Sequence, residues 1–302
     1  MSSAEIVRSR AEEWKAQQSR SRSLRRVLSI VRRQPLGVAA GVILMIIIVV
    51  AIAAPLIAPY DPYEVHPVDS LQGPNAAYLL GTDDLGRDLL SRTIYGARIS
   101  LEVGILAVAV GVSAGVLIGL VSGYVGGWVD MIIQRISDAF MAFPALILAM
   151  AVVSVLGSGL DKIIWVIAIV MIAPVGRVMR SSVLAVRQEA YVEAAIASGA
   201  SHLRVMVRHI LPNVAAPIIV LVSVLMGAAI LIEAGLSFLG LGIKPPEPSW
   251  GTMLSGVGAY YARQSPHLAL VPGAAISITV LALNLLGDAL RDELDPRLQG
   301  TR

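Results

Sequence analysis

Long apolar runs constrain this chain most, because six of them are each long enough to cross a lipid bilayer. Hydrophobic residues make up 56% of the 302 residues and charged residues only 15%, which leaves more apolar surface than a soluble domain can bury. We therefore expect an all-α polytopic membrane protein. The predicted spans are residues 36–58, 99–122, 139–157, 163–179, 214–236 and 268–286.

The polar segments between the spans define the expected organisation. Residues 1–35 form a basic tail, which differs from a secretory signal because the apolar run after it is long enough to stay in the membrane. Residues 59–98 form an external loop. Residues 99–288 form a membrane core that contains the polar loop 180–213, and residues 289–302 form a second tail.

Lys and Arg residues indicate the orientation. If the N-terminus is inside, 18 of the 24 fall in inner segments and six in outer ones, which favours cytosolic termini and a cytosolic loop 180–213. The net charge of +3 does not point to a nucleic acid partner. Nine basic residues precede Pro35, where orientation and anionic lipid explain them.

The central polar loop is predicted to form two short helices that meet at a glycine. Good helix formers end before Gly199, which can adopt the left-handed conformation that closes a helix. Ser201 is a candidate N-cap for the second helix, and Pro212 is expected to end it. Arg204 and Arg208 lie away from an apolar stripe, which favours a surface-lying helix. The stripe consists of Leu203, Met206, Val207 and Ile210.

Acidic residues outside the apolar runs suggest two further chemistries. Asp83, Asp84 and Asp88 supply the carboxylates that hard cations prefer, but their spacing lacks the order of a calcium loop. Arg87 and Arg92 are near enough to pair with them, and Thr82 or Asp83 is a candidate helix cap. Four acidic residues near span ends would suit a proton relay, although we expect all four at the membrane interface. They are Glu102, Asp161, Glu233 and Asp288.

Glycines and prolines predict how the spans pack. In the second span glycines recur at four- to seven-residue intervals, which lets another helix approach closely. They are Gly104, Gly111, Gly115, Gly119 and Gly123. Pro144 and Pro174 are expected inside the third and fourth spans, where they would kink the helices and form hinges beside a pathway.

Common catalytic and metal motifs are absent. The sequence has no G-x-x-x-x-G-K-[ST] phosphate loop, H-E-x-x-H or G-x-S-x-G. It has no cysteine, which excludes disulfides and Cys-ligated metals. The four histidines are scattered along the sequence, so we expect neither enzymatic activity nor a cofactor in this chain.

Seven ordered motifs resemble the second, C-type permease subunit of dipeptide, oligopeptide and nickel ABC importers. They are residues 80–88 (LGTDDLGRD), 123–130 (GYVGGWVD), 193–195 (EAA), 209–213 (HILPN), 236–242 (LSFLGLG), 245–251 (PPEPSWG) and 284–296 (NLLGDALRDELDP). The resemblance implies a type I importer permease fold with six transmembrane helices in a bacterial inner membrane.

The resemblance also implies partners and a substrate. The partners are a second, homologous permease, two cytosolic ABC ATPases that bind ATP and Mg, and an external substrate-binding protein. Short peptides are the implied substrate, with nickel chelates or glutathione-like peptides as alternatives. A self-sufficient secondary carrier or channel is the alternative of a different class. The central loop argues against it, because such a carrier needs no docking helix.

In that family the EAA loop is a coupling helix that docks on the ATPase. The matching positions, together with two residues of the apolar stripe, are the expected coupling residues here. They are Glu193, Ala194, Ala195, Gly199, Leu203, Met206, Leu211 and Pro212. Pro144 and Pro174 are the expected hinge or path positions.

Overall fold

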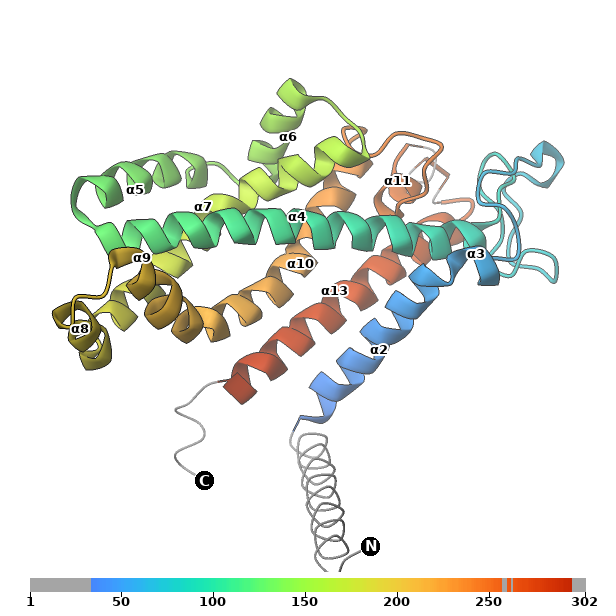
Figure 1. Cartoon of the computed structure of the whole chain (residues 1–302). Coiled ribbons are helices and arrows are strands. Elements are labelled where there is room, and N and C mark those ends of the chain that lie inside the picture. Colours follow the sequence, from blue (N-terminus) through green and yellow to red (C-terminus); the bar gives the residue numbers. More distant parts are fainter. Residues whose placement is uncertain (1–33, 257–259, 262, 295–302) are drawn as a thin grey trace, which may run out of the picture.

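Helices dominate the computed structural model, which describes residues 34–256, 260–261 and 263–294 (Figure 1). Five helical stretches are long and apolar enough to span a membrane, or six if one bent pair forms a single span. This confirms the all-α polytopic class. Most of the predicted tails, residues 1–33 and 295–302, lies outside the described residues. The long helices are α2 (Pro35–Ile52), α4 (Leu89–Val125), α7 (Leu160–Arg187), α10 (Ala215–Phe238) and α13 (His267–Leu294).

The glycines of α4 pack against α7, as their spacing predicted. A Cβ atom added to Gly119 would lie 2.5 Å from the carbonyl oxygen of Gly176, and one added to Gly115 would lie 2.6 Å from Val175. Gly111 and Gly123 meet α7 in the same way, whereas Gly104 faces Ile230 of α10. α4 and α7 therefore approach each other at backbone distance.

The third predicted span is broken. α5 (Gly127–Met141) and α6 (Ala145–Leu156) meet at 94°, and Pro144 is the extended residue before α6, with ψ 136°. The expectation that Pro144 lies inside a helix is wrong, because a proline disfavours helical conformation in the preceding residue and starts a helix more easily than it continues one. Pro174 does lie inside α7.

Two ion pairs hold α5 along α7. Arg180 donates from Nε and Nη2 to the two carboxylate oxygens of Asp130, and each hydrogen bond is 2.5 Å long. Arg177 pairs with Asp138. α7 continues to Arg187, so the polar loop starts about two turns later than the predicted residue 180.

The external loop ends before the predicted residue 98. Asp88 caps α4 by accepting hydrogen bonds from the backbone N–H and the hydroxyl of Ser91, both 2.7 Å, so Thr82 and Asp83 are not the cap. The predicted arginine pairing is confirmed, since Asp83 pairs with Arg87 and Arg92. No group of three or more metal-ligating side chains occurs in the described ranges.

Shorter helices complete the end of the bundle where α4 begins, and α2 packs beside α13 (Figure 1). The structure adds α3 (Ala54–Ile57), η1 (Pro67–Asp69) and α11 (Trp250–Leu254). The backbone of Gly37 on α2 lies against Ala289 on α13, so the start of α2 and the end of α13 lie at the same end of the bundle.

Glu233 differs from the other three acidic residues near span ends because its side chain is fully buried. It is fully buried within the bundle, five residues before the end of α10. Its carboxylate accepts hydrogen bonds from the hydroxyls of Ser237 and Ser249 at 2.8 Å and of Ser100 at 3.3 Å. Because Ser100 lies on α4 and Ser249 caps α11, one buried carboxylate joins three helices.

Candidate coupling site

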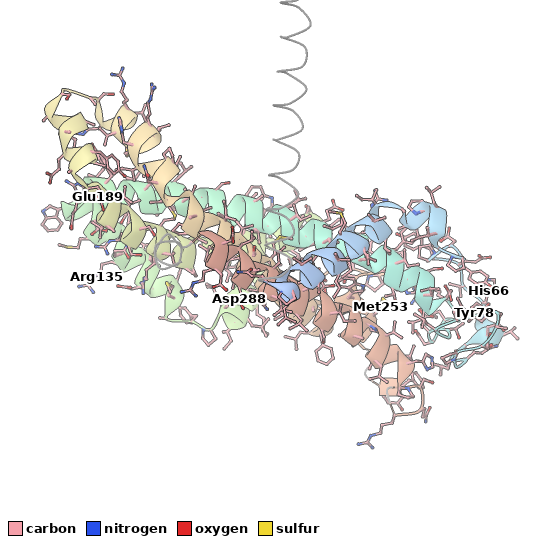
Figure 2. All side chains as sticks on the ribbon, turned by 90° about the horizontal axis from the view of Figure 1, so that it is seen from below. His66, Tyr78, Arg135, Glu189, Met253 and Asp288 are labelled. Atoms are coloured by element: carbon pink, nitrogen blue, oxygen red, sulfur yellow. The ribbon has the colours of Figure 1, made fainter. Side chains whose placement is uncertain are left out.

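The central polar loop folds into a compact helical unit, the coupling segment, which comprises residues 188–214. It lies at the end of the bundle marked by Glu189 in Figure 2, opposite the end marked by His66 and Tyr78. Four short elements form it, and the last leads directly into α10. They are α8 (Ala190–Ala197), α9 (His202–Arg204), the π-helix η2 (Val205–Ile210) and the 3-10 helix η3 (Leu211–Val214).

Gly199 makes the turn between the two halves of the segment. Its φ is +79°, and two hydrogen bonds close the end of α8: Gly199 N–H to Ile196 O at 2.9 Å and Ala200 N–H to Ala195 O at 3.1 Å. This pair of bonds defines a Schellman motif. A Cβ atom at Gly199 would meet nothing within 4 Å. The glycine is therefore required for its backbone conformation and not for space, as predicted.

Pro212 does not end the second helix, contrary to expectation. The hydrogen-bond register changes before the proline, since Leu211 N–H bonds to Met206 O in the π-helix. Pro212 then occupies the first turn of η3, where no N–H donor is needed. The chain consequently runs without a break from His202 into α10. Ser201 sits at the predicted N-cap position, but its side chain makes no capping hydrogen bond.

The π-helix also divides the predicted apolar stripe. Val205 and Ile210, five residues apart, are both fully buried, because i and i+5 share a face in a π-helix. Leu203 and Val207 point the other way and are 68% and 52% exposed. Burial of an aliphatic side chain stabilises by about 1.5–3 kcal/mol, so the inward pair anchors the segment and the outward pair remains available to a partner.

The predicted coupling residues divide between these two faces. Glu193, Ala194, Gly199, Leu203 and Pro212 are exposed, whereas three others are partly buried. Those three are Ala195, Met206 and Leu211. Tyr191 and Ile196, each 43% exposed, extend the outward apolar surface.

Three residues that sequence reasoning missed fix the segment to the spans. The hydroxyl of Tyr124, near the end of α4, lies 2.8 Å from Nδ1 of His202. The guanidinium of Arg187 lies 5.6 Å from the centre of the Tyr124 ring, a cation–π distance. Val192 of α8 is fully buried and belongs to the same hydrophobic core as Tyr124. The GYVGGWVD motif contains Tyr124, but a motif alone cannot identify His202 as its partner.

Comparisons with known proteins agree with this architecture. The family described as binding-protein-dependent transport system inner membrane component matches residues 115–300, and the N-terminal TM domain of oligopeptide transport permease C matches residues 23–74. The glutathione transport system permease protein GsiD of Shigella flexneri serotype 5b is 47% identical over 89% of each chain. GsiD of Escherichia coli O6:K15:H31 is 45% identical, again over 89% of each chain.

These relatives are permease components of ABC importers, which work with ATPase and substrate-binding partners. The two family matches cover the coupling segment and all the spans except most of α4. The chain therefore belongs to the family of binding-protein-dependent transport system inner membrane components, as a C-type permease subunit of the peptide and nickel importers.

Proposed function

We propose that this permease docks on a cytosolic ABC ATPase through the outward face of its coupling segment and lines half of the path taken by a short peptide. The observation that carries the proposal is the division of the segment into a buried anchor and an exposed apolar face, with Leu203 and Val207 exposed and Val205 and Ile210 buried. An apolar patch at a helical bundle's polar end suits a protein partner.

The remaining partners follow the importer architecture. A second, homologous permease supplies the other half of the path, a second ATPase completes the motor, and an external binding protein delivers the solute. ATP and Mg bind to the ATPases, so this chain is not an enzyme and holds no cofactor. The path lies between the two permeases, along the faces of the second to fifth spans, with Pro144 and Pro174 as hinge or path positions.

The substrate is a glutathione-like peptide, within the wider class of dipeptides and oligopeptides. The names of the relatives favour this choice over nickel chelates, because both describe glutathione transport. The solute crosses the bacterial inner membrane in this proposal, and both chain termini lie in the cytosol. The neighbouring positions of the start of α2 and the end of α13 support that arrangement.

Single cysteines test the docking and the orientation together, since the chain has none of its own. Leu203→Cys is expected to crosslink to an ATPase subunit and to resist an impermeant maleimide added outside cells. Val68→Cys, at a position 95% exposed in the external loop, is the matched control and is expected to label from outside. Outside labelling of both variants would overturn the orientation, and an absent ATPase crosslink would overturn the docking.

A further inference from the structure

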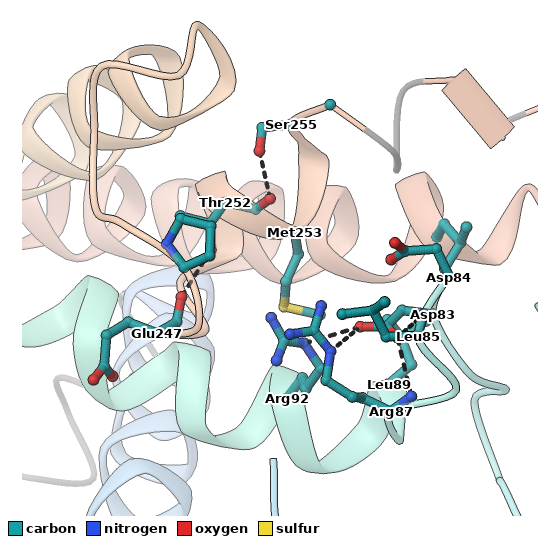
Figure 3. Close-up of a pocket in the computed structure, with 13 residues that line it drawn as sticks. Asp83, Asp84, Leu85, Arg87, Leu89, Arg92, Glu247, Thr252, Met253 and Ser255 are labelled. Atoms are coloured by element: carbon teal, nitrogen blue, oxygen red, sulfur yellow. Dashed lines mark hydrogen bonds and ion pairs between the residues drawn. The ribbon is translucent and has the colours of Figure 1, made fainter. Parts of the chain in front are cut away.

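A cavity of about 330 Å³ lies at the other end of α4 from the coupling segment (Figure 3). Its walls come from the external loop, the first turn of α4, the stretch 245–256 and the start of α13. α4 has 37 residues, so at ~1.5 Å per residue the cavity and the coupling segment are separated by roughly 55 Å. The volume is in the range of small-molecule sites.

One wall of the cavity carries two guanidinium groups that form ion pairs with the same carboxylate. Arg87 Nε lies 2.7 Å and Arg92 Nε 3.4 Å from the same oxygen, Oδ2 of Asp83. Arg92 is 6% exposed and also donates from Nη1 to the carbonyl oxygen of Pro62 at 2.9 Å. Two cations share one anion here, so this wall is suited to a further carboxylate, which arginine binds with paired hydrogen bonds.

Other walls carry carboxylates. Figure 3 shows Asp84 and Glu247 on opposite sides of the two guanidinium groups, with the Asp84 carboxylate directed toward them and the Glu247 carboxylate directed away. Burial, followed by the neighbouring Asp83 carboxylate, raises the pKa of Asp84, so a cation beside Asp84 would be favourable. Burial, followed by a 2.9 Å hydrogen bond to Glu247, raises the pKa of Tyr63 to about 12. The phenol therefore stays protonated at neutral pH and donates to the Glu247 carboxylate.

The cavity thus presents charges of both signs over an apolar floor. Leu89, Met253 and Leu268 line it and are 2–9% exposed. A ligand that carries one carboxylate and one ammonium group at a short separation matches both kinds of wall. An inorganic anion would meet the carboxylates, and a simple cation would meet the guanidinium groups, so neither matches both.

We propose that this cavity is a binding site on the permease itself for a zwitterionic solute with a free carboxylate and a free ammonium, such as a short peptide. Arg87 and Arg92 receive the carboxylate, and Asp84 faces the ammonium. The site rests on the proposed function in one respect, namely that the transported solute is a peptide. It adds a contact for the solute after it leaves the binding protein.

The test measures binding to the assembled importer in nanodiscs without its substrate-binding protein. Saturation-transfer NMR is recorded with L-alanyl-L-alanine, with its C-terminal amide and with its N-acetyl derivative. The zwitterion is expected to bind about 10-fold or more tightly than either derivative, because each lacks one charge-assisted interaction. Equal binding of all three compounds, or no binding by any, would overturn the proposal.

Variants assign the binding to the cavity. Arg87→Gln should weaken binding of the dipeptide about 10-fold or more, while Asp83 keeps Arg92 as its partner. Lys244→Gln also removes one positive charge from an exposed position near the cavity that does not line it, and it should leave binding unchanged. Asp84→Asn is a second, independent variant, and it should lower binding of the dipeptide but not of the N-acetyl derivative.

The outcomes separate this proposal from the proposed function. If Arg87→Gln leaves binding unchanged while coupled peptide uptake persists, the cavity is not the site although the transport function stands. If the importer binds the dipeptide in an Arg87-dependent manner but does not transport it, the site stands and the peptide assignment falls.

Discussion

The Tyr124 hydroxyl lies 2.8 Å from Nδ1 of His202, and this contact joins the last turn of α4 to the second half of the coupling segment. Tyr124 is only 7% exposed, and Arg187 at the end of α7 packs over its ring. The contact therefore links two spans and the coupling segment at one point. Because the first turn of α4 lines the cavity of Figure 3, one continuous helix connects the two ends.

Tyr124→Phe is expected to lower uptake while the complex still assembles. The variant keeps the ring beneath Arg187 and removes the hydroxyl, at a cost of about 0.5–1.5 kcal/mol for one hydrogen bond. Uptake and ATP hydrolysis in one reconstituted preparation measure the effect. Tyr191→Phe, which removes a hydroxyl from the exposed surface of α8, is the matched control. Equal loss in both variants would assign the effect to docking and not to the link with α4.

Glu233 is expected to be essential for stability, because it joins three helices from within the bundle. Glu233→Leu removes the acceptor of three serine hydroxyls, and leaving buried polar groups without partners costs about 1–3 kcal/mol each. We expect a marked fall in the thermal unfolding temperature of the detergent-solubilised complex. Glu102→Leu alters an exposed position on α4 and should leave that temperature nearly unchanged.

A side chain at Gly119 is expected to separate α4 from α7. In Gly119→Val the new Cβ would lie 2.5 Å from the Gly176 carbonyl oxygen, closer than van der Waals contact, and overpacking of this kind costs about 1–3 kcal/mol. The yield and unfolding temperature of the purified complex should both fall. Gly273→Val is the control, because nothing lies within 4 Å of a Cβ atom there; similar losses in both would point to a general cost of β-branching.

The sequence predicted local features well, since each depended on neighbouring residues. The break at Gly199 followed from the conformational freedom of glycine, and close packing along α4 followed from the spacing of its glycines. Features that depend on distant residues were missed or wrong. Glu233 lies near the end of an apolar run, and only the fold shows that Ser100 and Ser249 converge on it.

The predictions for Pro212 and for the apolar stripe failed because of one feature of the backbone, the π turn. A proline normally ends a helix. The π turn before Pro212 changes the hydrogen-bond register, so the proline lies in the first turn of η3, where no backbone N–H donor is needed. Because of the same π turn, Ile210 is buried in the protein interior and Val207 is exposed, although a period of 3.6 residues would put them on one face of the helix. Hydrophobic spacing cannot reveal such a change of helix type.

Gly199→Val is expected to uncouple ATP hydrolysis from transport. A valine at φ +79° adopts a left-handed conformation at a cost of about 1–2 kcal/mol, and no neighbouring atom contributes a clash. The strain should release the Schellman motif and change the angle between α8 and the second half of the segment. Insertion of the spans should survive, so the complex should either lose its ATPases or hydrolyse ATP without uptake.

Gly199→Asn separates backbone strain from a simple loss of glycine, because asparagine tolerates the left-handed conformation much better than valine. Uptake, ATP hydrolysis and subunit recovery are measured together for both variants. The expected order of uptake is the unchanged chain, then the asparagine variant, then the valine variant, with permease recovery equal in all three. If the valine variant matches the unchanged chain in every measurement, the turn at Gly199 does not transmit motion, and the coupling segment is only a surface helix.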